Sequence, residues 1–245
     1  MKRRNILLIA GAAVGVGALL IVAAFAMTGF DPQKLQTTNV ETVSEDHAFP
    51  ETISGVDIQT VSSDVRFAAS SDGTARVESR HSAQITETVE VKNGILTVRQ
   101  KQAKQGPKIG IDLSAEDDCL IVYLPGSELD SLSVQTVSGD MELGGLSAKG
   151  ASLESVSGEI ELKELIVSGK LTVGTVSGDV DLDRCDAGEI DIVTVSGEVE
   201  GTLLSPKQFD VHTISGKLDV PASESGAARC TISTTSGDVE LKLAR

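Results

Sequence analysis

The chain has very few aromatic side chains. They make up 2% of its 245 residues, with no Trp and a single Tyr, Tyr123. Aromatic rings are the platforms on which proteins stack sugars and the bases of single-stranded nucleic acid. Basic residues are also scarce, 21 against 36 acidic ones, so the chain lacks a positive surface for phosphate groups. We therefore expect no nucleic-acid partner.

Cysteine occurs only three times, an odd number for a chain that we expect to be exported. Cys185 and Cys230 fall in different apolar columns of the repeat described below, and Cys119 falls in an apolar, strand-like run. We expect three free thiols that pack as small hydrophobic side chains. Proline is sparse, and Val, Ile, Leu and Thr dominate the remaining composition, which is typical of many short strands.

The N-terminus carries a long apolar run. Residues 2–4 are basic, and the apolar part, residues 6–27, is long enough to cross a bilayer as a helix. Basic residues on this flank place the N-terminus in the cytoplasm and the rest of the chain outside. An uncleaved signal anchor fits the length, whereas Ala-Phe-Ala at residues 24–26 suits a cleaved signal peptide. We expect a single-pass cell-membrane protein with an extracytoplasmic C-terminal domain.

One ten-residue motif recurs through the second half of the chain. Residues 134–143 read Val-Gln-Thr-Val-Ser-Gly-Asp-Met-Glu-Leu, further copies follow, and a degenerate copy lies at residues 58–67. The Ser-Gly pairs begin at 138, 157, 177, 196, 215 and 236, a period of about 20 residues that is typical of solenoids. No copy can bury its apolar side chains alone, whereas stacked copies can.

The columns of the repeat predict the fold. Counted from the Ser of each copy, apolar residues recur six and four positions before it and three and five positions after it. Thr or Ser recurs two positions before, and strand alternation places this hydroxyl and the Ser itself on the inward face. The corner Gly supplies either a positive φ or a close backbone approach. We predict an all-β fold, a parallel β-solenoid with about 20 residues per coil that rises about 4.8 Å per coil. A β-sandwich is the alternative, but a sandwich does not require one motif in register.

Four segments follow from these patterns. Residues 1–30 form the cytoplasmic tip and one transmembrane helix, residues 31–50 a polar linker, residues 51–130 a less regular N-terminal β cap, and residues 131–245 the solenoid repeats. Within the cap, Asn-Gly at residues 93–94 predicts a hairpin.

The last copy of the motif ends close to Arg245. We therefore expect the C-terminal coil to form an open end of the stack. Such an end either supports end-to-end self-association or is protected by Lys242 and Arg245.

Two columns of the repeat are almost wholly acidic. They lie two and four positions after the Ser, where alternation exposes them to solvent, and Lys217 interrupts the first column. Carboxylate oxygens at this spacing are candidates for weak binding of divalent cations, although no dedicated metal site is predicted. The candidate residues are Asp140, Glu142, Glu159, Glu161, Asp179, Asp181, Glu198 and Glu200.

The repeated Ser is not a credible nucleophile. A catalytic Ser occurs once, with a His base within reach. Here the Ser recurs in every copy, while His47, His81 and His212 are scattered along the chain. We expect no enzyme activity, no catalytic residues and no cofactor.

The motif [Thr/Ser]-x-[Ser/Thr]-Gly-[Asp/Glu]-[Val/Ile]-x-[Leu/Ile], preceded by a basic N-terminus, one membrane segment and a polar linker, resembles a bacterial family of β-strand-repeat envelope proteins. Its members are often labelled "putative adhesins" and are otherwise of unknown function. The resemblance covers roughly residues 29–245, and residues 30–35 and 216–239 look especially similar. It implies a surface-exposed parallel β-solenoid and carries over no catalytic or ligand residues.

We therefore expect a non-enzymatic, membrane-anchored, adhesin-like protein that makes contacts at the bacterial envelope. Its partner would be an envelope protein, a peptide or a surface ligand. The alternative is a sensory or regulatory protein of envelope stress that binds a membrane partner or a cationic peptide.

Overall fold

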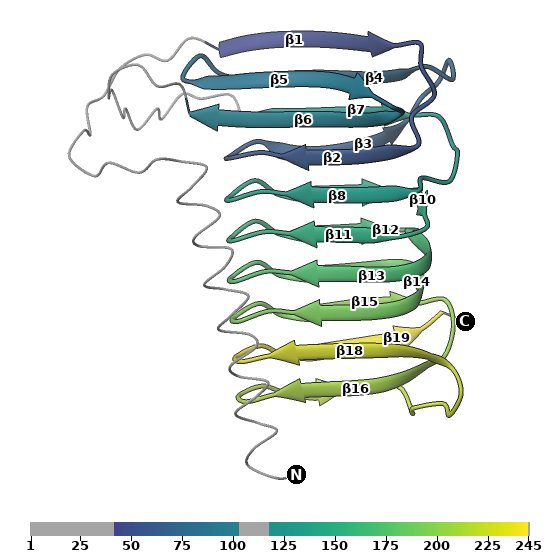
Figure 1. The fold of residues 1–245 in the computed structure, drawn as a ribbon. Coiled ribbons are helices and arrows are strands. Elements are labelled where there is room, and N and C mark those ends of the chain that lie inside the picture. Colours follow the sequence, from purple (N-terminus) through teal and green to yellow (C-terminus); the bar gives the residue numbers. More distant parts are fainter. Residues whose placement is uncertain (1–41, 103–117, 245) are drawn as a thin grey trace, which may run out of the picture.

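The computed structural model describes residues 42–102 and 118–244, which form nineteen strands and no helix (Figure 1). The all-β class is therefore confirmed. The strands are β1 (Thr42–Phe49), β2 (Gly55–Gln59), β3 (Asp64–Ala69), β4 (Ala75–Ser82), β5 (Ile85–Lys92), β6 (Ile95–Gln102), β7 (Cys119–Leu124), β8 (Ser131–Gln135), β9 (Met141–Gly144), β10 (Ser147–Ala148), β11 (Ala151–Glu154), β12 (Ile160–Lys163), β13 (Ile166–Gly174), β14 (Val180–Val193), β15 (Val199–Leu203), β16 (Lys207–Thr213), β17 (Leu218–Asp219), β18 (Ala228–Thr234) and β19 (Val239–Leu243). Within these ranges no helix is long and apolar enough to cross a membrane. The expected membrane segment, residues 6–27, lies outside them.

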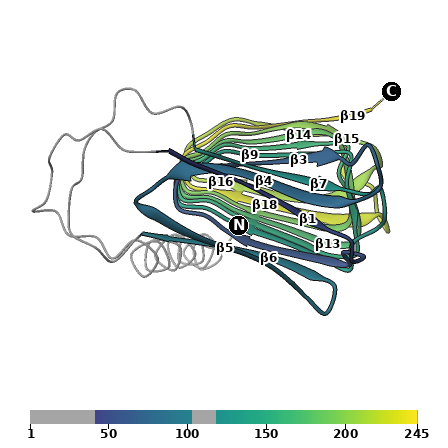
Figure 2. The ribbon, with the colours of Figure 1, turned by 90° about the horizontal axis from the view of Figure 1, so that it is seen from above.

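The strands form two broad sheets that face each other across one core (Figures 1 and 2). Sheet 1 contains, in spatial order, β5, β6, β2, β8, β11, β13, β14, β18 and β16, and the two-residue strand β10 pairs with the start of β13. Sheet 2 contains β1, β4, β7, β3, β9, β12, β14, β15, β19 and β17. β14 is long enough to turn the corner and pair in both sheets. Each motif copy supplies one strand to each sheet, so the copies stack as coils in a solenoid-like shape.

The apolar columns of the motif fill the space between the two sheets. In sheet 1, Leu153 lies in parallel register between Val134 and Val173, and all three side chains are fully buried. The matching column of sheet 2 stacks in the same way. Because like residues lie above and below each other, every inner coil buries its apolar side chains against the same kinds of neighbour.

The corner glycines are required by close packing of one coil on the next. None of the six has a positive φ. A Cβ on Gly158 would lie 1.9 Å from the carbonyl oxygen of Gly139, and a Cβ on Gly178 would lie 2.0 Å from that of Gly158. The same close contact recurs at Gly139, Gly197, Gly216 and Gly237. Of the two explanations that the sequence leaves open, close backbone approach is the correct one.

The two hydroxyl columns point in opposite directions. The buried hydroxyl of Ser155 accepts a hydrogen bond from the backbone N–H of Gly158 at 2.8 Å, within its own corner. The Ser of the Ser-Gly pair is instead exposed in every copy. Ser157, for example, donates to the carbonyl of Val137 in the neighbouring coil at 3.2 Å. The prediction that this Ser faces inward is wrong, because β11 ends before the corner and strand alternation no longer applies there.

The N-terminal strands close the first end of the stack with antiparallel pairs, β1 with β4, β4 with β7 and β5 with β6. The hairpin between β5 and β6 has the predicted two-residue loop, with Asn93 at φ 53° and Gly94 at φ 77°. The degenerate motif copy forms a coil of the main stack, made by β2 and β3.

The predicted linker, residues 31–50, contains strand β1 over Thr42–Phe49. Its description as a linker is therefore wrong for these residues. β1 pairs with β4 on one side only and most of its side chains are exposed. An edge strand of this kind needs no alternation of apolar and polar residues, so no strand signal is present in these residues.

The last two coils stack in the reverse of their chain order, as Figure 1 shows. β18 lies between β14 and β16, and β19 lies between β15 and β17. The coil of β16 and β17 therefore forms the open end: Leu218 is 47% exposed, whereas its register partner Val239 is 1% exposed. The prediction that the C-terminal coil forms the open end is wrong, and Lys242, in β19, does not guard that end. Phe209 shares a column with the smaller Cys230, and the terminal position gives the ring more room.

The start of β16 is held from two sides. Loop residues cover its outer edge: the Phe209 N–H donates to Ser223 Oγ at 2.9 Å, and the Glu224 N–H donates to the Lys207 carbonyl at 3.0 Å. The buried Lys207 side chain reaches past β18 to β14. There it donates to the carbonyl of Ala187 at 2.7 Å and forms an ion pair with Asp186.

The corner packing predicts a strong effect of a single methyl group. We expect Gly158→Ala to lower the free energy of unfolding by about 2 kcal/mol or more, because the Cβ would overlap a backbone carbonyl that cannot move without shifting a coil. Gly144→Ala is the matched control, because a Cβ there meets nothing within 4 Å. Urea unfolding of the full chain in detergent measures both. Equal midpoints for the two variants would contradict the packing explanation.

Candidate functional site

The acidic columns lie on the outer surface of sheet 2, and the order of the coils makes them continuous. Because β19 lies between β15 and β17, Asp238 and Glu240 follow Glu198 and Glu200 in space. Lys217 therefore ends the first column instead of interrupting it. Five consecutive coils carry an acidic residue at both positions. We call these ten residues the acidic surface: Asp140, Glu142, Glu159, Glu161, Asp179, Asp181, Glu198, Glu200, Asp238 and Glu240.

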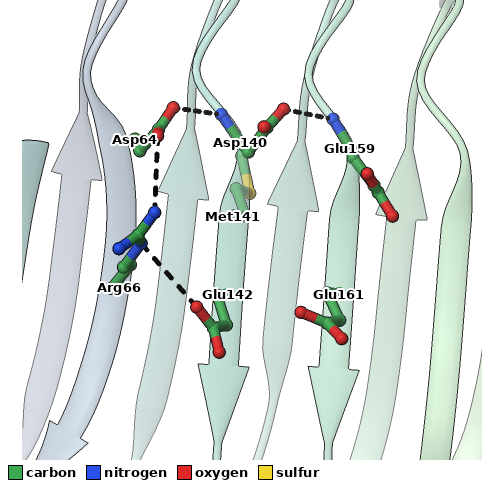
Figure 3. A pocket seen from close by; sticks show the side chains of 7 residues that line it. All are labelled: Asp64, Arg66, Asp140, Met141, Glu142, Glu159 and Glu161. Carbon is green, nitrogen blue, oxygen red and sulfur yellow. Dashed lines mark hydrogen bonds and ion pairs between the residues drawn. The ribbon is translucent and has the colours of Figure 1, made fainter. Parts of the chain in front are cut away.

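The aspartates of the first column bond to the backbone of the next coil. Asp64 Oδ1 accepts a hydrogen bond from the Asp140 N–H at 3.0 Å, and Asp140 Oδ1 accepts one from the Glu159 N–H at 2.9 Å (Figure 3). The same bond recurs from Glu198 N–H to Asp179 and from Lys217 N–H to Asp238. These carboxylates stabilise the stack, so this column has a structural role that the second column lacks.

Basic side chains contact the second column near its two ends. Glu142 lies 3.7 Å from Arg66 and 3.6 Å from Lys163, which also pairs with Glu161. At the other end Lys242 pairs with Glu240 at 2.6 Å. Exposed pairs of this kind are screened by solvent and contribute little to stability. Asp181 and Glu200 lie between them, so the negative charge is concentrated in the middle of the column.

Two pKa values on the acidic surface are raised, first by partial burial and then by neighbouring carboxylates. Partial burial raises the pKa of Glu159, and the charges of Asp140, Glu161 and other acidic neighbours raise it further. Partial burial likewise raises the pKa of Asp181, followed by the charges of Glu161 and Asp183. Both shifts disfavour the ionised form. A cation beside either carboxylate would lower its pKa again, because an opposite charge favours the ionised form.

A shallow depression of about 200 Å³ lies at the first end of the acidic surface, as Figure 3 shows. Asp64, Arg66, Asp140, Met141, Glu142, Glu159 and Glu161 line it. Its one cation, Arg66, lies within 4 Å of both Asp64 and Glu142. Among residues 42–102 and 118–244, no three His, Cys, Asp or Glu side chains are placed to hold a metal ion. Weak cation binding along the columns stays a prediction.

The three histidines lie in separate environments. His47 Nε2 lies 2.9 Å from Glu45, His81 Nδ1 lies 3.0 Å from the carbonyl of Ser82, and His212 Nε2 lies 2.8 Å from Asp210. None of these contacts involves a Ser of the motif. The described residues thus hold no paired nucleophile and base of the kind that acyl transfer needs.

The cysteines differ in burial. Burial raises the pKa of Cys185 to about 11 and that of Cys230 to about 12, so both thiols stay protonated and unreactive. Cys119 is partly exposed at the start of β7, and none of the three forms a disulfide. The prediction of core packing is confirmed for Cys185 and Cys230 and wrong for Cys119.

Two features of the structure were not predicted from the sequence: the burial of Lys207 and the backbone hydrogen bonds of the first acidic column. Lys207 follows Ser205 and Pro206 in what reads as a polar turn, and no column signals that its side chain is buried. The backbone bonds of the first column do have a signal. Asp and Glu alternate along this column from coil to coil, as Asp140 and Glu159 do in the first two coils. The hydrogen bond to the next coil is accepted by the aspartate, which has the shorter side chain.

The raised pKa of Glu159 predicts a pH-dependent gain in stability. A carboxyl whose pKa is higher in the folded chain destabilises that state once it is ionised. We expect Glu159→Gln to raise the free energy of unfolding by about 0.2–1 kcal/mol at pH 7. The gain should vanish as the pH falls below 4.5, the ordinary value for this group. Unfolding at several pH values measures it, with Glu51→Gln as an exposed control. A loss of stability at pH 7 would contradict the account.

Comparison with known proteins gives the family. The sequence profile of Toastrack DUF4097 matches residues 53–245. No curated protein matches the chain. Among solved structures, a "putative cell adhesion protein" from Clostridium sporogenes has a TM-score of 0.48 and 14% identity, over 83% of this chain and 100% of its own. A "putative adhesin" from Bacteroides fragilis has a TM-score of 0.40 and 13% identity, over 83% of this chain and 97% of its own. A "putative lipid binding protein" from Parabacteroides distasonis has a TM-score of 0.32 and 14% identity, over 86% of this chain and 100% of its own.

Similarities this distant carry no conclusion about binding. The profile match is different, because it covers more than half of the chain, including every copy of the motif. It confirms the resemblance to an adhesin-type family of β-repeat proteins. The chain belongs to the Toastrack DUF4097 family.

Proposed function

We propose that the chain is a non-enzymatic, adhesin-like protein of the bacterial cell surface whose acidic surface binds cationic partners. The observation that carries the proposal is the unbroken run of acidic pairs over five consecutive coils. Coils about 4.8 Å apart give this array a length of about 19 Å. A fixed array of one sign raises the local concentration of oppositely charged ligands and speeds their association.

The two sheets differ in a way that supports a directional contact. In three coils the corresponding outward position of sheet 1 carries a hydroxyl, at Ser133, Ser152 and Thr172, whereas the next register partner is Asp191. Sheet 2 therefore carries an unbroken acidic run, whereas the outer face of sheet 1 mixes neutral residues with charges of both signs, such as Lys170 and Asp191. A partner that recognises charge would approach sheet 2.

We also propose that residues 6–27 anchor the chain in the cell membrane, with the N-terminus in the cytoplasm and the stack outside. The basic residues 2–4 on one flank of the apolar run support this orientation. The described chain enters the stack at its first end, through β1. The first end would then be nearest to the anchor.

The sensory alternative uses the same surface. A sensory protein would bind a cationic peptide there and transmit the event to a membrane partner. Affinity purification of the full chain from native membranes separates the two functions. A stoichiometric membrane protein that stays bound in high salt favours the sensory function, since screening of exposed charges would release a purely electrostatic contact.

Neutralising the second column tests the acidic surface. The variant carries Glu142→Gln, Glu161→Gln, Asp181→Asn and Glu200→Gln, which leave the backbone bonds of the first column intact. We expect its affinity for an oligolysine peptide to fall by about tenfold or more at low salt, because the attraction depends on the summed charge. Fluorescence anisotropy with the full chain in detergent measures the affinity.

The matched control loses the same charge elsewhere. It carries Glu128→Gln, Glu154→Gln, Asp191→Asn and Glu224→Gln, none of which lies in sheet 2. We expect its affinity to stay within about twofold of the unsubstituted chain. Equal losses for the two variants would show that net charge alone, and not this surface, attracts the peptide.

A further inference from the structure

The C-terminal coil, made of β18 and β19, occupies a slot between two coils that precede it in the chain. β18 pairs in parallel with β14 on one side and with β16 on the other. β19 pairs with β15 and β17. To reach the slot, the chain leaves β17 at the open end and doubles back through residues 220–227. The strands that form both walls of the slot thus precede, in the sequence, the coil that fills it.

We propose that this slot is a binding site for the C-terminal coil of a second copy, so that two copies join by exchanging residues 228–244. Among the motif copies that the structure describes, the C-terminal coil is the one that lies between two coils that both precede it in the chain. The proposal is independent of the acidic surface, since it depends on the inner edges of the strands.

The exchanged pair would keep the contacts of the single chain. The incoming coil has the same sequence, so Cys230, Ile232 and Val239, all at most 1% exposed, would fill the same positions. Asp238 would accept the same 2.7 Å hydrogen bond from the Lys217 N–H of the slot. Only the connecting loop changes its conformation. Exchange of an identical element is therefore governed by concentration, which is high for copies held in one membrane.

The connecting loop is suited to open. Residues 222–226 are exposed, and Gly226, at φ 86°, adopts a backbone conformation that few other residues tolerate. Its bonds to the stack are few: Glu224 N–H to the Lys207 carbonyl and Phe209 N–H to Ser223 Oγ. Residues 221–227 can extend to about 23 Å, which sets the reach of the coil toward a second stack.

The two walls of the slot would stay connected to each other when the coil leaves. The side chain of Lys207, in β16, donates to the carbonyl of Ala187 and pairs with Asp186, both in β14. This contact bypasses β18 and holds the outer wall to the inner one. The empty slot would then present two rows of unpaired backbone groups, which accept a strand readily.

Cysteine cross-linking between two different chains tests the exchange. Glu200 and Glu240 are register partners across the slot and both point to solvent. Full chains carrying Glu200→Cys or Glu240→Cys, each also with Cys119→Ser, are mixed in detergent, unfolded and refolded together, and oxidised. Since each chain has one engineered thiol, a 200–240 disulfide forms only where one chain's coil fills the other's slot.

We expect the yield of this heterodisulfide to exceed that of a control mixture by about tenfold and to rise with concentration. The control mixture carries Glu161→Cys and Asp181→Cys, register partners in adjacent coils that cannot exchange. A yield at the control level, with all four thiols reactive toward a maleimide, would overturn the proposal. So would a dimer by mass without the 200–240 disulfide, which would indicate end-to-end contact. Peptide binding is not involved, so the outcome is separate from the test of the acidic surface.

Discussion

The fit of each corner glycine against the carbonyl oxygen of the neighbouring coil is the contact on which the stack depends. At Gly158 and Gly197 there is no room for even one methyl group, so the coils approach at the spacing of backbone hydrogen bonds along their whole length. This contact fixes the register of both sheets at once. Every column, apolar, hydroxyl or acidic, is then placed directly above its copy in the next coil.

That register has an electrostatic cost. Partial burial, and after it the neighbouring carboxylates, raise the pKa values of Glu159 and Asp181, so the ionisation of these groups opposes the stacking that brings them together. Part of the cost is offset where an aspartate such as Asp140 accepts a backbone N–H from the next coil. The remaining charge is free to attract a cationic ligand. A repeat that had no use for this charge could carry neutral residues there, as sheet 1 does at Ser133 and Ser152.

Most of the inner stack could be predicted from the sequence, because its signals are local. The alternation of apolar and polar residues around Leu153 predicted the buried column, and the pair Asn93-Gly94 predicted the hairpin. The order of the coils could not be predicted. Every copy presents the same columns above and below, so β18 fits beside β14 as well as β16 would. Side-chain size gave the only hint, since Phe209 is the largest residue of its column and lies at the open end.

Eight of the ten residues of the acidic surface were candidates from the sequence, whereas Asp238 and Glu240 were not, and neither was the continuity of the surface. Read along the chain, Lys217 breaks the acidic column, whereas in space it ends the column after Asp238. The alternation of Asp and Glu in the first column is a sequence signal, but by itself it does not predict the backbone bonds. The bond from the Glu159 N–H to Asp140 depends on the distance between coils, which no single strand encodes.

The claim that the partner contacts sheet 2 can be tested most directly by site-specific photo-cross-linking of the full chain in native membranes. A benzophenone side chain is introduced as Asp181→p-benzoyl-Phe or Glu200→p-benzoyl-Phe in sheet 2, and as Ser152→p-benzoyl-Phe or Thr172→p-benzoyl-Phe in sheet 1. We expect salt-sensitive adducts from the sheet 2 positions and none from sheet 1. Adducts from sheet 1 alone would contradict the assignment of function to the acidic surface.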